Sequence, residues 1–128
     1  MSYHFSKTVS VPFDEAIEQV TEALKENGFG VLTTIDVKTT LKNKIDVDFR
    51  PYTILGACNP QFAYQALQSE DKIGAMLPCN VVVQQTDDGR VEVSAVDPVA
   101  SMQAVENPAL GDIAKQVQGL LKATIENL

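Results

Sequence analysis

The sequence contains no tryptophan, one histidine and two cysteines, and it lacks any excess of positive charge. Seventeen acidic residues against ten basic residues give a net charge of −7. Because nucleic-acid-binding surfaces neutralise phosphates with lysine and arginine, this balance argues against DNA, RNA or anionic lipid as a partner. No apolar run approaches the ~20 residues that cross a bilayer, and the start of the chain has no apolar stretch of signal-peptide length. We therefore expect a cytoplasmic protein without a membrane or nucleic-acid partner.

The composition is that of an ordinary folded chain. Hydrophobic residues make up 45 % of the 128 residues and charged residues 21 %, which argues against disorder. The chain has no linker, low-complexity tract or repeat at solenoid spacing. Its length is within the range of one domain, so we expect a single domain over residues 1–128.

The hydrophobic pattern predicts five strands and three helices, in the order strand, helix, strand, strand, helix, strand, strand, helix. Two Asn-Pro pairs, at 59–60 and 107–108, are typical of helix starts. Residues 38–44 fit either a loop or one helical turn, and residues 45–49 alternate like a strand. The strands are predicted near 3–11, 29–37, 52–57, 79–85 and 90–96, and the helices near 14–27, 60–69 and 108–128.

Helices and strands do not alternate strictly, and the best-defined strand pair is a hairpin over residues 81–96 around Asp87-Asp88-Gly89. This order favours an α+β fold, with a largely antiparallel, curved sheet and two main helices packed on one face. The other face is then free for water, a ligand or a second copy. Since the last helix also keeps apolar residues for over four turns, we expect a homodimer. The hydrophobic pattern is compatible with a dimer contact through the last helix, the free face of the sheet or a sheet edge.

The two cysteines occupy the places where chemistry is most plausible. Cys58 follows an apolar strand and precedes a helix N-terminus, where the helix dipole and free N–H groups favour a thiolate. Cys79 follows Leu77-Pro78 and opens the next strand. If these strands are antiparallel neighbours, both thiols lie at the same end of the sheet. A cleft at that end is predicted to be lined by Gly56, Cys58, Asn59, Pro78 and Cys79.

Three interpretations of this region remain open. Both cysteines are small buried packing residues, or they form a transient redox pair, since a structural disulfide is disfavoured in a reducing cytoplasm. Alternatively they hold a metal or haem, with further ligands from His4 or a second subunit. No complete catalytic constellation is present and no cofactor is identified. The leading hypothesis is therefore a non-catalytic module that binds a small ligand or partner protein in the cleft; the alternative is thiol-based redox or metal chemistry at Cys58 and Cys79.

Other charged groups give weaker signals. The pairs Asp46/Asp48 and Asp87/Asp88 resemble catalytic or metal-binding pairs, but a solvated strand face and a turn explain them more simply. One basic cluster stands out on the acidic chain. It fits a solvated loop, with an anionic ligand as the alternative. Its members are Lys38, Lys42, Lys44 and Arg50.

Four segments carry a family resemblance. They are Leu-Gly-Ala-Cys-Asn-Pro (55–60), Phe-Ala-Tyr-Gln-Ala-Leu (62–67), Leu-Pro-Cys-Asn (77–80) and Val-x-Val-x-x-x-Asp-Pro (91–98). With the long closing helix, they make the chain similar to the domain of unknown function 302 family over most of its length. The resemblance implies a small bacterial or archaeal protein, a dimer and an α+β fold of the TATA-binding-protein-like class, but no activity. Residues 41–47 lack a glycine that the family often has there, so the shape of this loop is the least constrained.

Overall fold

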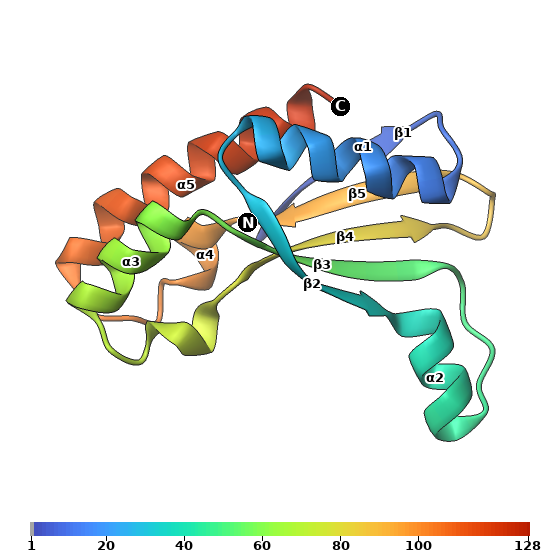
Figure 1. The fold of residues 1–128 in the computed structure, drawn as a ribbon, viewed down its shortest axis with the longest axis horizontal. Coiled ribbons are helices and arrows are strands. Elements are labelled where there is room, and N and C mark those ends of the chain that lie inside the picture. Colours follow the sequence, from blue (N-terminus) through green and yellow to red (C-terminus); the bar gives the residue numbers. More distant parts are fainter. Residues whose placement is uncertain (1) are drawn as a thin grey trace.

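The computed structural model describes residues 2–128. Within them the strands form a five-stranded sheet in the order β1-β5-β4-β3-β2, and every neighbouring pair is antiparallel (Figure 1). The antiparallel sheet and the α+β class are therefore confirmed. The strands are β1 (His4–Val9), β2 (Gly30–Asp36), β3 (Tyr52–Cys58), β4 (Cys79–Gln85) and β5 (Val91–Val96).

The three predicted helices are present with slightly different ends, and three short helical segments are added, of which the sequence allowed one helical turn at residues 38–44 as an alternative to a loop. The long helices are α1 (Phe13–Glu26), α3 (Pro60–Ser69) and α5 (Pro108–Glu126). The additional segments are α2 (Val37–Ile45), the 3₁₀ helix η1 (Ile73–Met76) and α4 (Pro98–Ser101). None of the helices formed by residues 2–128 is long and apolar enough to span a membrane.

Both α1 and α5 cover the same face of the sheet, as predicted (Figure 1). Every fourth residue of α1, from Ala16 through Val20 to Leu24, is buried, because one face of a helix repeats at that spacing. On the strands, alternate residues such as Val81 and Val83 point into the same core. The layer between helices and sheet is thus the main hydrophobic core.

The predicted hairpin is confirmed. β4 and β5 pair in register from Val81 opposite Ala95 to Gln85 opposite Val91. Gly89 in the connecting turn has φ +83°, a left-handed conformation that glycine adopts without a Cβ clash. The hydroxyl of Thr86 donates to the carboxylate of Asp88 and closes the turn.

The second face of the sheet, called the open face below, carries no helix layer (Figure 1). Polar and apolar side chains share it: Ser6, Ser94, Val82 and Ile54 lie in one row across four strands. The Oγ atoms of Ser6 and Ser94 are 2.7 Å apart, and Ser6 Oγ is 2.7 Å from His4 Nδ1. These hydrogen-bonded side chains of His4, Ser6 and Ser94 make the open face partly polar.

The two edges of the sheet differ. On β1, Lys7 donates from Nζ to the backbone oxygens of Glu126 and Leu128 at the end of α5, at 2.9 and 2.6 Å. On β2, the register shifts between Val31 and Thr33, which is a β-bulge. Each edge strand therefore has one irregular or charged feature.

The alternating pattern at residues 45–49, which is typical of a strand, does not form one. Asp36 accepts hydrogen bonds from the backbone N–H of Thr39 at 3.0 Å and from its hydroxyl at 2.9 Å, so it caps α2. The same bonds lower the pKa of the Asp36 carboxyl. Helix α2 continues to Ile45 and ends at Asp46, whose φ is +55°. This cap and the helical stripe of residues 37, 41 and 45 outweigh the short alternating pattern.

The acidic pair in this segment has a structural explanation. Asp46 and Asp48 both lie near Lys42 Nζ, at 2.8 and 3.4 Å, and all three side chains are exposed. The lysine neutralises two carboxylates at the end of a helix, where a cation is favoured. Asp46 and Asp48 are thus part of the exposed end of α2 and do not form a strand face.

Candidate functional site

The end of β3 and the start of β4 meet as the sequence hypothesis required. Ala57 lies directly opposite Cys79 in the β3–β4 pair, so Cys58 and Cys79 are diagonal neighbours at one end of the sheet. The next residue, Asn59, caps α3: its side-chain oxygen accepts the backbone N–H of Phe62 at 3.4 Å. The chain therefore turns from strand to helix immediately after Cys58.

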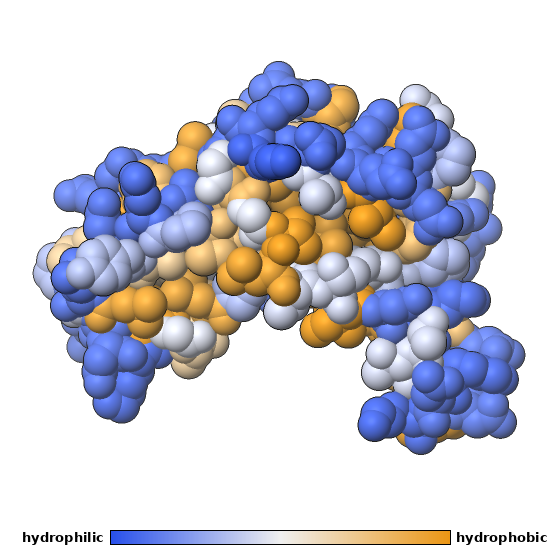
Figure 2. All heavy atoms as spheres, in the orientation of Figure 1, coloured by the Kyte–Doolittle hydropathy of each residue, from blue (hydrophilic) through white to orange (hydrophobic). Residues whose placement is uncertain are grey.

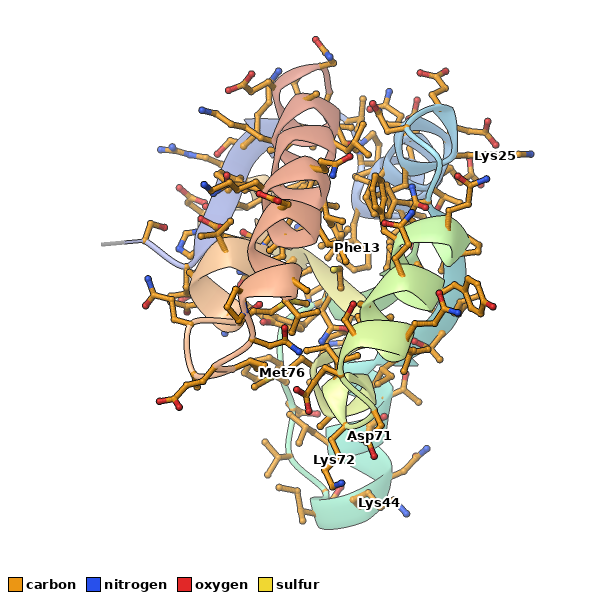
Figure 3. All side chains as sticks on the ribbon, turned by 90° about the vertical axis from the view of Figure 1, so that its left-hand side faces the viewer. Phe13, Lys25, Lys44, Asp71, Lys72 and Met76 are labelled. Atoms are coloured by element: carbon orange, nitrogen blue, oxygen red, sulfur yellow. The ribbon has the colours of Figure 1, made fainter. Side chains whose placement is uncertain are left out.

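A cavity of about 30 Å³ lies between this end of the sheet, α3 and α5. Figure 3 views this end of the molecule, with α3 and α5 in front. The wall of the cavity consists of apolar side chains and thiols, apart from one amide, that of Asn59. The lining residues are Phe29, Ala57, Cys58, Asn59, Phe62, Ala63, Ala66, Leu77, Pro78, Cys79, Pro98, Met102, Ile113, Ala114 and Val117.

Four of the five residues predicted to line a cleft are brought together here. Cys58, Asn59, Pro78 and Cys79 are all part of the cavity wall. Gly56 is not. It is buried on the open face of the sheet, where its α-carbon lies beneath Thr33 and Pro78.

Sequence reasoning missed the larger part of the wall. Phe62 and Ala66 of α3, and Ile113 and Val117 of α5, belong to helical stripes that were interpreted only as core. The spacing of these residues shows that they share a helix face. It does not show that the two faces meet at the end of the sheet where the cysteines lie.

Gly56 has no room for a side chain. A Cβ at this position would overlap the hydroxyl of Thr33 and would lie 2.7 Å from Cγ of Pro78. We expect Gly56→Ala to lower the free energy of unfolding by about 1–3 kcal/mol, the usual cost of overpacking. Urea unfolding followed by circular dichroism measures this change. The double variant Gly56→Ala/Thr33→Ala should recover part of the loss, because it removes one of the two overlaps. If the losses of unfolding free energy caused by the two single substitutions simply add in the double variant, the steric explanation is wrong.

Burial raises the pKa of both thiols. The pKa of Cys79 rises to about 11, mainly because the side chain is buried and secondarily because Cys58 is close. The pKa of Cys58 is also raised by burial. The expectation that the helix N-terminus would lower the pKa of Cys58 is therefore wrong. The physical reason is that partial burial of the thiol disfavours the charged thiolate.

The cysteines are free thiols. His4 does not join them: it lies on β1, two strands away from Cys79, and is exposed on the open face. Among residues 2–128 the structure holds no group of three His, Cys, Asp or Glu side chains arranged to bind a metal ion. A metal site built from the two cysteines and His4 of one chain is thus excluded by the fold.

Comparisons with known proteins agree with this fold. A family model described as "Domain of unknown function DUF302" matches residues 5–128. The structure is similar to the crystal structure of an uncharacterized conserved protein DUF302 from Bacillus stearothermophilus. The TM-score is 0.91 at 35 % sequence identity, and the match covers 98 % of each chain. No curated protein matches the sequence.

Proposed function

The chain belongs to the DUF302 family, which is defined without a known function, and we propose that it is a non-catalytic, homodimeric binding protein. The proposed ligand is a small apolar molecule, or the apolar end of a larger one. The proposed site is the cavity beside Cys58 and Cys79.

The single observation that carries this proposal is an apolar cavity at the place where three structural elements converge. Protein interiors are close-packed, and voids larger than a water molecule are few. A volume of about 30 Å³ has room for roughly two waters, but apolar walls offer them few hydrogen bonds. Dry apolar cavities of about 150 Å³ accept benzene and xenon, so this smaller cavity has to widen before it admits such a probe. The walls therefore favour an apolar occupant over a polar one.

Two flexible parts of the wall allow the cavity to widen. Phe62 and Met102 are only half-buried, and methionine has an unbranched side chain that adapts to irregular spaces. We expect rotation of these side chains to enlarge the space without moving the sheet. The proposed ligand is therefore larger than the cavity in its present form.

The thiols support binding better than redox chemistry. The nucleophile in thiol–disulfide exchange is the thiolate, and burial raises the pKa of both Cys58 and Cys79. At neutral pH both side chains are therefore neutral and act as small apolar groups. This favours their role as cavity walls over the redox alternative.

Homodimer formation is the second part of the proposal. The open face of the sheet carries no helix layer (Figure 1), and half-buried apolar residues such as Ile54 and Val82 lie on it. If a second copy of the chain packs on this face, the same surface of both copies is buried in a closed, symmetric dimer.

The cavity is tested by titrating ¹⁵N-labelled protein with benzene and with xenon. We expect saturable amide shifts confined to residues around the cavity on α3 and α5. Ala63→Leu adds volume at the half-buried side of the wall and should weaken probe binding at least about tenfold, equivalent to about 1.4 kcal/mol.

Ala23→Leu is the matched control, because Ala23 is also a half-buried helical alanine but lies on α1, outside the cavity. This variant should bind both probes like the wild type. The absence of saturable shifts with either probe, or equal binding by the Ala63→Leu variant, would refute the cavity as a ligand site.

A further inference from the structure

Residues 37–51, which comprise α2 and the loop to β3, form a projection that we call the arm. No residue of the arm is buried. Figure 1 shows α2 beyond the end of the sheet, on the side away from α1 and α5. The arm therefore stands outside both layers of the fold.

The arm nevertheless has an apolar side. Val37, Leu41 and Ile45 follow each other at intervals of four, so they lie on one face of α2. Ile45 is 63 % exposed and Val47, just after the helix, is 41 % exposed. A nine-residue helix is marginally stable in water by itself, because helices of this size depend on packing of an apolar face. The chain thus has an amphipathic helix whose apolar face is only partly covered, since Val37 and Leu41 are half-buried and Ile45 is exposed.

The arm is fixed in place. Lys38 Nζ donates to the backbone oxygen of Phe49 at 2.8 Å, which joins the start of α2 to the loop. The guanidinium of Arg50 stacks on the rings of Phe49 and Tyr52, at 4.4 and 5.5 Å, and its Nε donates to Gln84 at 2.9 Å. A projecting surface that is already ordered loses little conformational entropy on binding.

The same molecule has a hollow on the open face of its sheet. The hollow has a volume of about 320 Å³, and its wall includes Tyr3, Tyr52, Val82, Val96 and Glu92. Figure 2 shows the outline of the molecule indented between the arm and the opposite end, so the lower side is concave. The hollow combines apolar side chains with one acidic residue and with the polar side chains of His4, Asn80, Gln84 and Ser94.

The charges of the arm and of the rest of the chain are opposite. The arm has four basic and two acidic side chains, a net charge of +2. The whole chain carries −7, which leaves −9 outside the arm. The basic side chains on α2 are Lys38, Lys42 and Lys44. Opposite charge attracts the arm to an acidic body and disfavours contact between two arms.

We propose that the arm of each copy packs into the hollow of a second copy. The apolar face of α2, with Leu41 and Ile45, covers Val82 and Val96, and the net positive charge of the arm lies toward the side that carries Glu92. Because each chain supplies one arm and one hollow, a two-fold axis satisfies both contacts and closes the assembly. This inference rests on the homodimer of the proposed function and identifies its interface.

The interface is tested by placing the photo-crosslinking residue p-benzoylphenylalanine at position 45 in a mixture of ¹⁴N- and ¹⁵N-labelled chains. We expect mixed-label crosslinks to peptides that contain Tyr3, Val82 or Val96. In sedimentation equilibrium, Ile45→Ser and Val82→Ser should each raise the dimer dissociation constant at least about tenfold. Leu67→Ser is the matched control, since Leu67 is 45 % exposed on α3 outside both surfaces, and it should change the constant less than about twofold.

The outcomes separate this interface from the rest of the proposal. A wild-type dimer whose dissociation constant is unchanged by Ile45→Ser, or whose crosslinks map elsewhere, overturns the interface but leaves the homodimer. A wild-type chain that stays monomeric at concentrations of tens of micromolar overturns both. Binding of benzene or xenon in the cavity is measured independently, so its result is unaffected by either outcome.

Discussion

Replacing Phe29 by alanine is expected to lower the free energy of unfolding by about 3–5 kcal/mol, the usual cost for a buried phenylalanine. Phe29 is 2 % exposed and belongs both to the main core and to the wall of the cavity. Its backbone N–H donates to Leu24 at the end of α1, at 2.9 Å, so the side chain lies where α1 passes into β2. Since domains are stable by about 5–15 kcal/mol in total, this single change removes a large part of the stability.

Urea unfolding followed by circular dichroism tests this prediction. The midpoint should fall while the slope stays close to that of the wild type, because the area exposed on unfolding changes little. Tyr64→Ala is the matched control: Tyr64 is an aromatic residue on α3 but is 64 % exposed, so its loss should cost about 0.5 kcal/mol or less. Similar effects of the two substitutions would show that the junction of α1 and β2 is loosely packed.

The second large effect concerns the reactivity of Cys79. With a pKa of about 11, roughly one thiol in 10⁴ is ionised at pH 7, against about 1 % for a cysteine with the ordinary pKa of 9.0. We therefore expect Cys79 to react with Ellman's reagent roughly 100-fold more slowly than a cysteine with that ordinary pKa, before any steric effect is added. The Cys58→Ala variant isolates this reaction, and the Cys79→Ala variant isolates Cys58. A rate equal to that of free cysteine would favour the redox alternative.

The same shift of the Cys79 pKa makes the stability of the fold depend on pH. In the unfolded chain the thiol ionises near its ordinary pKa of 9.0, whereas in the folded chain it stays protonated up to about pH 11. Between these values the unfolded state binds fewer protons, so the free energy of unfolding falls as pH rises. The loss contributed by Cys79 is at most about 3 kcal/mol and is absent below pH 9. Comparison of the wild type with Cys79→Ala from pH 8 to pH 11 isolates this contribution from lysine and tyrosine titration.

The sequence predicted those parts of the fold in which local pattern and burial agree. The hairpin of β4 and β5 combines alternating valines with a turn that contains glycine, and α1 has apolar residues at regular helical spacing. α2 was predicted only as one helical turn, as an alternative to a loop, because none of its residues is buried and the decisive signal is one capping carboxylate, that of Asp36. A single cap is a weak pattern in a stretch of polar and β-branched residues.

The candidate site was predictable in part for a topological reason. Cys58 and Cys79 end and begin strands that proved to be antiparallel neighbours, so their positions followed from strand order. The contribution of Met102 and Ile113 depends on how α4 and α5 pack against α3, which spacing along the chain does not determine. The direction of the Cys58 pKa was missed because the burial of the thiol, which raises the pKa, depends on how the chain packs around it and not on its position before a helix.

The two edge strands have a consequence for uncontrolled aggregation. A sheet with free edges can grow by adding strands from other molecules, which is the route to fibrils. In this chain Lys7 brings a charge to β1, tied to the end of α5, and the bulge at residues 31–33 distorts the regular amide row of β2. Both features are known to oppose strand addition. Strand addition at either edge is thereby disfavoured, so the homodimer proposed above would form through a face of the sheet and would not propagate along an open row of backbone groups.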